Sequence, residues 1–165
     1  MMKKLILTLA AIATTFGAFA QVKYNTGSIE FDKDLGIINA NAKLDLKTFK
    51  IDVSTSHNIP IPKIEEMLQV MEPAEVVLAT DIAQISQKPI DEVVTSYKKN
   101  KEKGWGVVAK EMGIKPGSPE FHELKGKTKK QKEKGKKGKK EEKGKAKAKA
   151  KDKSKNKGKS KGKKK

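Results

Sequence analysis

The chain of 165 residues contains no cysteine and no arginine, and only eight of its residues are aromatic. Without cysteine it forms no disulfide, offers no thiolate to zinc and lacks the residue that bacterial lipoproteins acylate. All 38 basic residues are therefore lysines. Lysine lacks the planar fork with which arginine clamps phosphates and reads bases, so the composition disfavours sequence-specific DNA binding.

Long apolar runs are also scarce. The longest covers residues 5–17, follows Lys3 and Lys4, and is followed by Ala-Phe-Ala at 18–20. Thirteen residues fall short of the ~20 that a membrane-spanning helix needs, and this order is typical of a secretory signal cleaved before Gln21. We expect residues 1–20 to be a signal peptide, and the rest to be exported to the periplasm or secreted, without a transmembrane segment.

The charge is divided unevenly along the chain. Residues 125–165 hold 23 lysines and four acidic residues, a net charge of +19. The other 124 residues hold 15 lysines and 16 acidic residues, a net charge of −1. The sequence therefore predicts an ordinary, slightly acidic globular part followed by a polycationic tail.

The tail, residues 125–165, has no aromatic and no branched apolar residue. Such a segment cannot offset the entropy of ordering, so we predict that it is disordered. Its lysines should bind polyanions with low selectivity and strong salt dependence, and residues 146–165 are similar in composition to the tails of linker histones. The expected partner is an anionic envelope surface, a polysaccharide or another polyanion. The lysines predicted to contact it are Lys125, Lys127, Lys129, Lys130, Lys136, Lys137, Lys139, Lys140, Lys163, Lys164 and Lys165.

Helical periodicity dominates the globular part. Apolar residues recur at i, i+3, i+4 and i+7 within 64–71, 90–97 and 105–112, and at weaker helical spacing within 46–53 and 78–85. Prolines at three expected first turns suit helix starts. We predict an all-α array of about six short helices, with a helical domain over residues 46–124.

Residues 21–45 form an N-terminal arm for which two interpretations stay open. The sequence SIEF at 28–31 alternates like a strand, whereas Leu35, Ile38 and Ala42 suit a helix.

The only tryptophan begins the apolar stripe at 105–112. Gly104 and Gly106 flank it, which allows either a close backbone approach or a tight entry into the helix. Two apolar residues on a last short helix should close the core. The predicted core residues of this region are Trp105, Val108, Ala109, Met112, Phe121 and Leu124.

KGWGVVAKEMGIKPGSPEFHELK at 103–125, together with EPAEVVLATDIAQISQKPIDEVVTSYKKNK at 72–101, resembles a family of small secreted bacterial proteins without an assigned activity. Its signature is GWGxxAKExGIKPGSxEFHxLK, and the likeness covers roughly residues 44–125. The resemblance implies a compact, exported helical module and no chemistry. The matching residues are Trp105, Gly106, Ala109, Lys110, Glu111, Gly113, Pro116, Gly117, Ser118, Phe121, His122 and Leu124.

No catalytic, cofactor-binding or metal-ligating set stands out. His57 and His122 are the only histidines and lie 65 residues apart. Residues 79–100 and 109–124 have the helix-turn-helix cadence of DNA readers, but the export signal and the missing arginine weigh against that function. The predicted protein is a non-enzymatic polyanion binder. Two alternatives stay open: the helical domain is an enzyme, inhibitor or ligand-binding module with a solubilising tail, or the protein binds nucleic acid nonspecifically.

Overall fold

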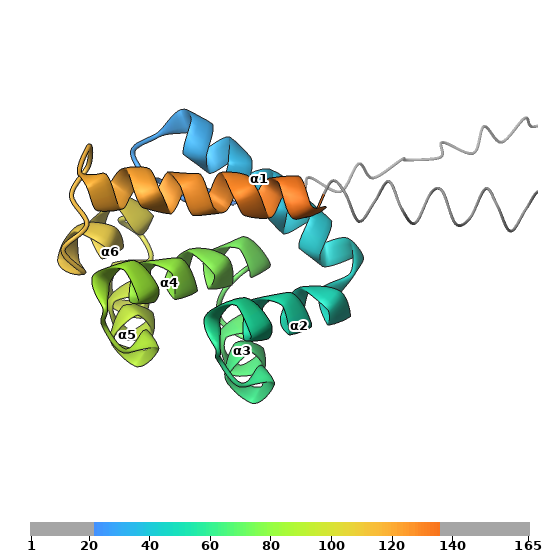
Figure 1. Ribbon diagram of the computed structural model, residues 1–165. Coiled ribbons are helices and arrows are strands. Elements are labelled where there is room, and N and C mark those ends of the chain that lie inside the picture. Colours follow the sequence, from blue (N-terminus) through green and yellow to red (C-terminus); the bar gives the residue numbers. More distant parts are fainter. Residues whose placement is uncertain (1–21, 136–165) are drawn as a thin grey trace, which may run out of the picture.

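The computed structural model describes residues 22–135, and this part of the chain is folded into seven helices with no strand (Figure 1). This confirms the all-α prediction. The seventh helix, over residues 119–135, is called the basic helix below. The predicted signal peptide and residues 136–165 of the predicted tail lie outside the described part. The other six helices are α1 (Ile29–Leu44), α2 (Leu46–His57), α3 (Ile61–Leu68), α4 (Pro73–Ser86), α5 (Ile90–Asn100) and α6 (Trp105–Glu111).

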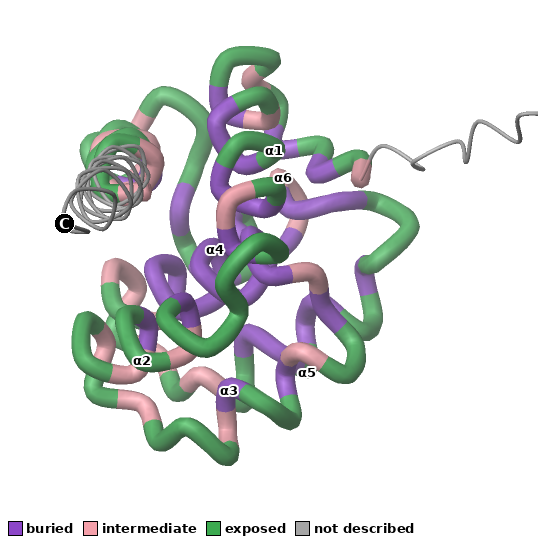
Figure 2. The backbone as a smooth tube through the Cα atoms, turned by 90° about the vertical axis from the view of Figure 1, so that its right-hand side faces the viewer, coloured by how far each residue is buried: buried purple, intermediate pink, exposed green. Residues whose placement is uncertain are grey.

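Helix α4 lies at the centre of the fold (Figure 2). Every residue from Pro73 to Ile82 is buried, including the polar Glu75, Thr80 and Asp81, because other helices surround α4 on several sides. Helices α1, α2, α3 and α5 all pack against it. A capping box between Glu72 and Glu75 closes its N-terminus, and Pro73 occupies the first turn, where no amide hydrogen is needed.

Helix α1 resolves the open question about the N-terminal arm in favour of a helix. The Ser28 hydroxyl caps it, accepting a hydrogen bond from the Phe31 amide at 3.4 Å. Phe31, Leu35 and Ile38 follow a helical spacing and are buried in the same core as α4. The apparent strand pattern at 28–31 has no partner strand in the described part of the chain, and Ile29 points to solvent with 78% of its surface exposed.

The segment before α1 is held by the glycines that flank Trp105. The Trp105 amide donates to the Tyr24 carbonyl at 2.8 Å, and the Gly106 amide donates to the Asn25 carbonyl at 3.0 Å. A Cβ at Gly104 would lie 2.3 Å from the Asn25 Cβ, and Gly104 has a φ of +87°. Only glycine fits there, so the structure shows the close backbone approach, one of the two possibilities that the sequence allowed.

The end of the packed part differs from the expectation. Leu124 was expected to be the last residue with anything to bury, yet the basic helix continues to residue 135. Leu124 is 1% exposed and Thr128, one turn later, is fully buried, with its hydroxyl donating to the Leu124 carbonyl at 3.1 Å. Residues 125–135 therefore belong to the folded domain, although they contain no large apolar side chain.

Leu124 anchors the basic helix, so its truncation should destabilise the protein. We expect Leu124→Ala to lower the free energy of unfolding by about 2–4 kcal/mol, because it leaves a cavity in the core. The matched control is Ile29→Ala, which removes an exposed side chain and should stay within about 0.5 kcal/mol of wild type. Urea denaturation compares the three proteins. Equal midpoints for all three would contradict the described packing of the basic helix.

Candidate functional site

The basic helix is fastened to the domain by three of its own lysines. Lys125 Nζ lies 3.6 Å from Glu30 Oε2 of α1, and Lys132 Nζ lies 2.5 Å from Asp34 Oδ1 one turn further along α1. Lys127 Nζ lies 3.9 Å from Asp81 Oδ1 of α4 and donates a hydrogen bond to Gln84 at 2.6 Å. The lysine stems lie along the protein surface while their charges meet acids. These three side chains are called the docked lysines below.

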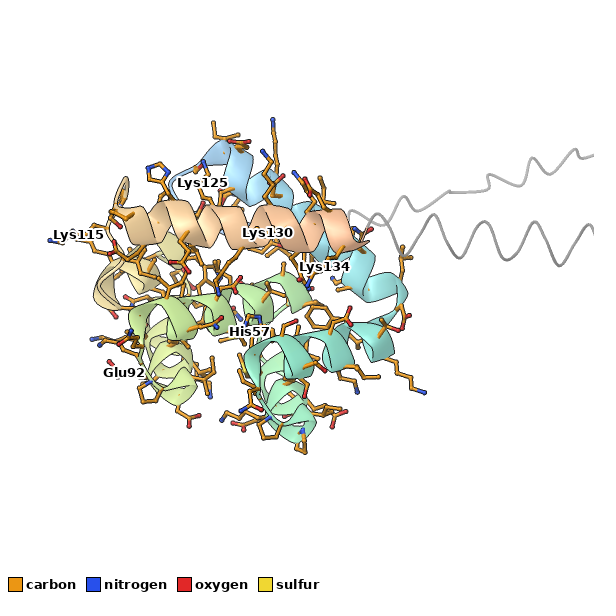
Figure 3. The ribbon with its side chains drawn as sticks, viewed as in Figure 1. His57, Glu92, Lys115, Lys125, Lys130 and Lys134 are labelled. Atoms are coloured by element: carbon orange, nitrogen blue, oxygen red, sulfur yellow. The ribbon has the colours of Figure 1, made fainter. Side chains whose placement is uncertain are left out.

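Three other lysines of the same helix have no acidic partner among the described residues. Lys129, Lys130 and Lys134 are exposed and form no ion pair within residues 22–135. In Figure 3, Lys130 lies on the face of the basic helix that is turned away from the domain, whereas Lys134 lies at the edge of that helix nearest α2 and α4. These three side chains, the outward lysines, have their charges available to an external partner.

The structure thus divides the lysines that were predicted to bind polyanions. Lys125 and Lys127 are docked, which corrects the expectation that they belong to a free tail, because carboxylates of the domain already pair with them. Lys129 and Lys130 are exposed as expected. The remaining predicted lysines lie outside the described residues; they are Lys136, Lys137, Lys139, Lys140, Lys163, Lys164 and Lys165.

Because the folded part extends to residue 135 and not to 124, the net charges of the folded part and of the following segment change. Residues 22–135 hold 19 lysines and 17 acidic residues, a net charge of +2, and residues 136–165 hold 17 lysines and three acidic residues, a net charge of +14. The folded part is therefore nearly neutral overall, and its outward lysines lie on the helix that leads into the strongly basic segment.

A histidine and an aspartate are buried beneath the basic helix. His57 ends α2, and its Nε2 lies 3.7 Å from Asp81 Oδ1; the two side chains are 11% and 5% exposed. The Nδ1 atom of His57 is buried without a hydrogen-bond partner among the described residues. Figure 3 shows His57 on the side of α2 that faces the basic helix. Asp81 thus lies between two nitrogen-bearing side chains, His57 and Lys127.

Burial shifts the pKa of both members of this pair. Removal from water raises the pKa of Asp81 to about 7; Lys127 opposes this rise and Glu123 adds to it. Burial lowers the pKa of His57, with a further lowering by Lys127 and Lys134, while a hydrogen bond to Gln84 acts in the opposite direction. Near neutral pH the neutral forms of both groups are therefore favoured more than in water.

The two histidines do not meet in a site. His57 is half-buried beneath the basic helix, whereas His122 is exposed on that helix. Across residues 22–135, no three histidine, aspartate or glutamate side chains gather in an arrangement that could hold a metal ion.

Glu75 is a second buried carboxylate, and it organises the region around Trp105. Its Oε1 accepts from Trp105 Nε1 at 3.1 Å, and its Oε2 accepts from the Tyr97 hydroxyl at 3.0 Å and from the Glu72 amide at 2.8 Å. The Tyr97 and Trp105 rings stack with centroids 4.8 Å apart. Burial raises the pKa of Tyr97, and the negative charge of Glu75 raises it further. One carboxylate thus joins α4, α5 and α6.

Five of the six predicted core residues of this region are buried. Phe121 is only half-buried, and its ring meets Phe31 edge to face with centroids 6.1 Å apart. The remaining five are buried: Trp105, Val108, Ala109, Met112 and Leu124.

A hollow of about 410 Å³ opens beside Glu75, between the N-terminal segment, the α3–α4 turn and α5. Glu72, Glu75 and Tyr97 form part of its wall. Both carboxylates already accept hydrogen bonds within the domain: Glu75 from the three donors above, and Glu72 from Asn39 at 3.2 Å, with Lys43 at 2.6 Å. Their hydrogen bonds are accounted for by the fold itself.

Comparison with known proteins adds no assignment. No protein-family model, curated protein or solved structure matches the chain. The resemblance of residues 103–125 to a secreted family therefore stays a prediction. Among residues 22–135, no helix is long and apolar enough to cross a membrane.

Sequence reasoning missed the acids that receive the docked lysines. Glu30 and Asp34 are spaced four residues apart on α1, which places them on one face of a helix. Lys125 and Lys132, at i and i+7 on the basic helix, also share a face. This complementary spacing was the available signal, but the tail was expected to have no fixed face.

Asp81 should give the fold a pH dependence whose sign follows from its raised pKa. Its folded-state pKa of about 7 exceeds the ordinary value of 3.8, so its contribution to stability is fully present below about pH 4 and is lost as the pH rises to 7. Asp81→Asn has no proton to lose there. We expect its gain in free energy of unfolding over wild type to be larger at pH 8 than at pH 5, by about 2 kcal/mol.

Urea denaturation at the two pH values measures this difference. Asp52→Asn, which removes a carboxylate from an exposed position of α2, controls for the change in net charge. A gain for Asp81→Asn that is the same at both pH values would contradict the described burial of Asp81.

Proposed function

We propose that the protein is an exported, non-enzymatic polyanion binder, in which the helical domain presents a lysine-rich segment to anionic surfaces. The observation that carries the proposal is the division of charge: a net +2 over residues 22–135 and a net +14 over residues 136–165. A polycation of this density releases counterions when it meets a polyanion, and this release drives binding without base or sugar recognition.

The division of the lysines on the basic helix supports the same function. The docked lysines lie within 4 Å of carboxylate oxygens of Glu30, Asp34 and Asp81. The outward lysines are exposed, and they extend the basic surface of the following segment back onto a rigid helix. The polyanion-binding surface in this proposal therefore begins at Lys129 and continues through residues 136–165.

The direct test compares the chain of residues 21–165 with that of residues 21–135 in binding to immobilised heparin over a salt series. The cut after residue 135 keeps the whole described basic helix, whereas a cut after Leu124 would remove Thr128 and Lys132. We expect the long chain to bind with a steep salt dependence. The short chain should lose several units of the slope of log affinity against log salt, because 17 lysines are removed.

Matched triple variants test whether the position of charge matters in addition to its amount. Replacing Lys129, Lys130 and Lys134 by Gln should weaken binding more than replacing three exposed lysines of α5 and α6. Those control positions are Lys98, Lys99 and Lys110. Equal binding by the long and short chains would refute the proposal, whatever the triple variants do. Competition by duplex DNA far below the concentration at which heparin competes would favour the nucleic-acid alternative.

A further inference from the structure

The turn between α1 and α2 exposes two leucines that are separated by a single residue in the sequence. Leu44, the last residue of α1, is 70% exposed, and Leu46, the first residue of α2, is 43% exposed. We call residues 44–46 the leucine corner. Asp45 between them is fixed by its role as N-cap of α2, where its carboxylate accepts from the Thr48 amide at 3.0 Å. The cap fixes the turn and so holds both leucines in place.

In the exported chain expected after cleavage before Gln21, no other segment has the chemistry to cover the leucine corner. Residues 22–135 leave both leucines exposed in the folded domain. Residues 136–165 contain no aromatic and no branched apolar residue, so they offer almost no apolar area with which to bury a leucine. Once residues 1–20 are removed, as the signal-peptide prediction expects, an occupant of this corner that excludes water comes from outside the chain.

The strongly basic segment starts beside the same corner. Gly135, the last described residue of the basic helix, packs against Asn41 of α1: a Cβ on Gly135 would lie 3.0 Å from the Asn41 Nδ2 atom. Asn41 is one helical turn before Leu44, on the same side of α1. The end of the basic helix and the end of α1 lie at the same end of the molecule in Figure 1. The 30 residues with a net charge of +14 thus continue from a point close to the leucine corner.

We propose that the leucine corner inserts into the interfacial region of an anionic lipid bilayer while residues 136–165 bind its headgroups. This inference rests on the proposed function and names its partner. A bilayer offers negative charge and an apolar layer within a few ångströms of each other, whereas heparin and nucleic-acid backbones offer only the charge. A weak apolar contact and a polybasic segment are the two signals that together give stable attachment to a membrane surface.

The charges at the corner itself are balanced. Asp45 is held charged, since the hydrogen bonds to Thr48 lower its pKa, and the exposed Lys47 lies two residues after it. Lys43 on the other side already pairs with Glu72 at 2.6 Å. The corner therefore adds apolar area with little net charge, and attraction to the headgroups comes from the segment after residue 135.

The test uses the chain of residues 21–165 and two probes. One is a vesicle of phosphatidylglycerol and phosphatidylcholine, and the other is heparin of comparable charge density. The test variant is Leu44→Gln with Leu46→Gln, and Leu44→Gln alone keeps the test valid should the double variant unfold. The matched control is Ile29→Gln, which removes an apolar side chain at least as exposed as either leucine, at the opposite end of α1.

We expect the double variant to bind anionic vesicles roughly tenfold more weakly than wild type, because it loses the apolar area of two partly exposed leucines. Its heparin affinity should stay unchanged, and Ile29→Gln should match wild type on both probes. Vesicle binding by the folded variants at wild-type strength would overturn the inference and leave the proposed function standing. Equal losses on vesicles and heparin would also overturn it. If wild type binds neither vesicles nor heparin, the proposed function itself is refuted.

Discussion

The ion pair between Lys132 and Asp34 joins two positions 98 residues apart, and it decides where the folded domain ends. The side chains are only 16% and 12% exposed, so each charge needs the other, because an unpaired charge at such a depth is costly. Together with the buried Leu124 and Thr128, this pair holds a lysine-rich helix against α1 and α4. By composition alone, residues 125–135 look like an unstructured tail, and these contacts distinguish them from one.

The lysines of the basic helix are of two kinds: some lie beside acids of the domain, and others are exposed without an acidic partner among the described residues. The inner face closes the core over His57 and Asp81, and its docked lysines lie beside acids of α1 and α4. Lys129, Lys130 and Lys134 are exposed and have no acidic partner among the described residues. A helix that fixes charges in this way presents them at lower entropic cost than a free chain. The domain thereby supports the basic segment rather than merely preceding it.

Most of the fold could be predicted from the sequence, since the apolar periodicity at 64–71, 90–97 and 105–112 matches α3, α5 and α6. The glycines around Trp105 were consistent with a close backbone contact, but they did not indicate that Tyr24 and Asn25 would form it. The role of Glu75 could not be predicted from the sequence. Its position suits a helix start, but only the fold brings Trp105 and Tyr97 to its carboxylate. Long-range pairing of this kind leaves no local pattern.

The boundary at Leu124 was misplaced for a physical reason. A count of large apolar residues measures only one source of stability, and residues 125–135 use others: a buried threonine, lysine stems along the surface and three ion pairs. Charge composition did predict that positive charge accumulates after the domain. It could not show which lysines have partners, because those partners, Glu30, Asp34 and Asp81, lie far away in the sequence.

We propose that external anions bind the outward lysines and the segment after residue 135, while the docked lysines stay beside their acids. Residue-resolved amide and lysine NMR of the chain of residues 21–165, titrated with heparin, tests it most directly. We expect the chemical shifts of residues 129, 130, 134 and 136–165 to change at low heparin concentration, and those of Lys125, Lys127 and Lys132 to change little. Early changes at the docked lysines, or changes centred on Glu75 and its hollow, would contradict it.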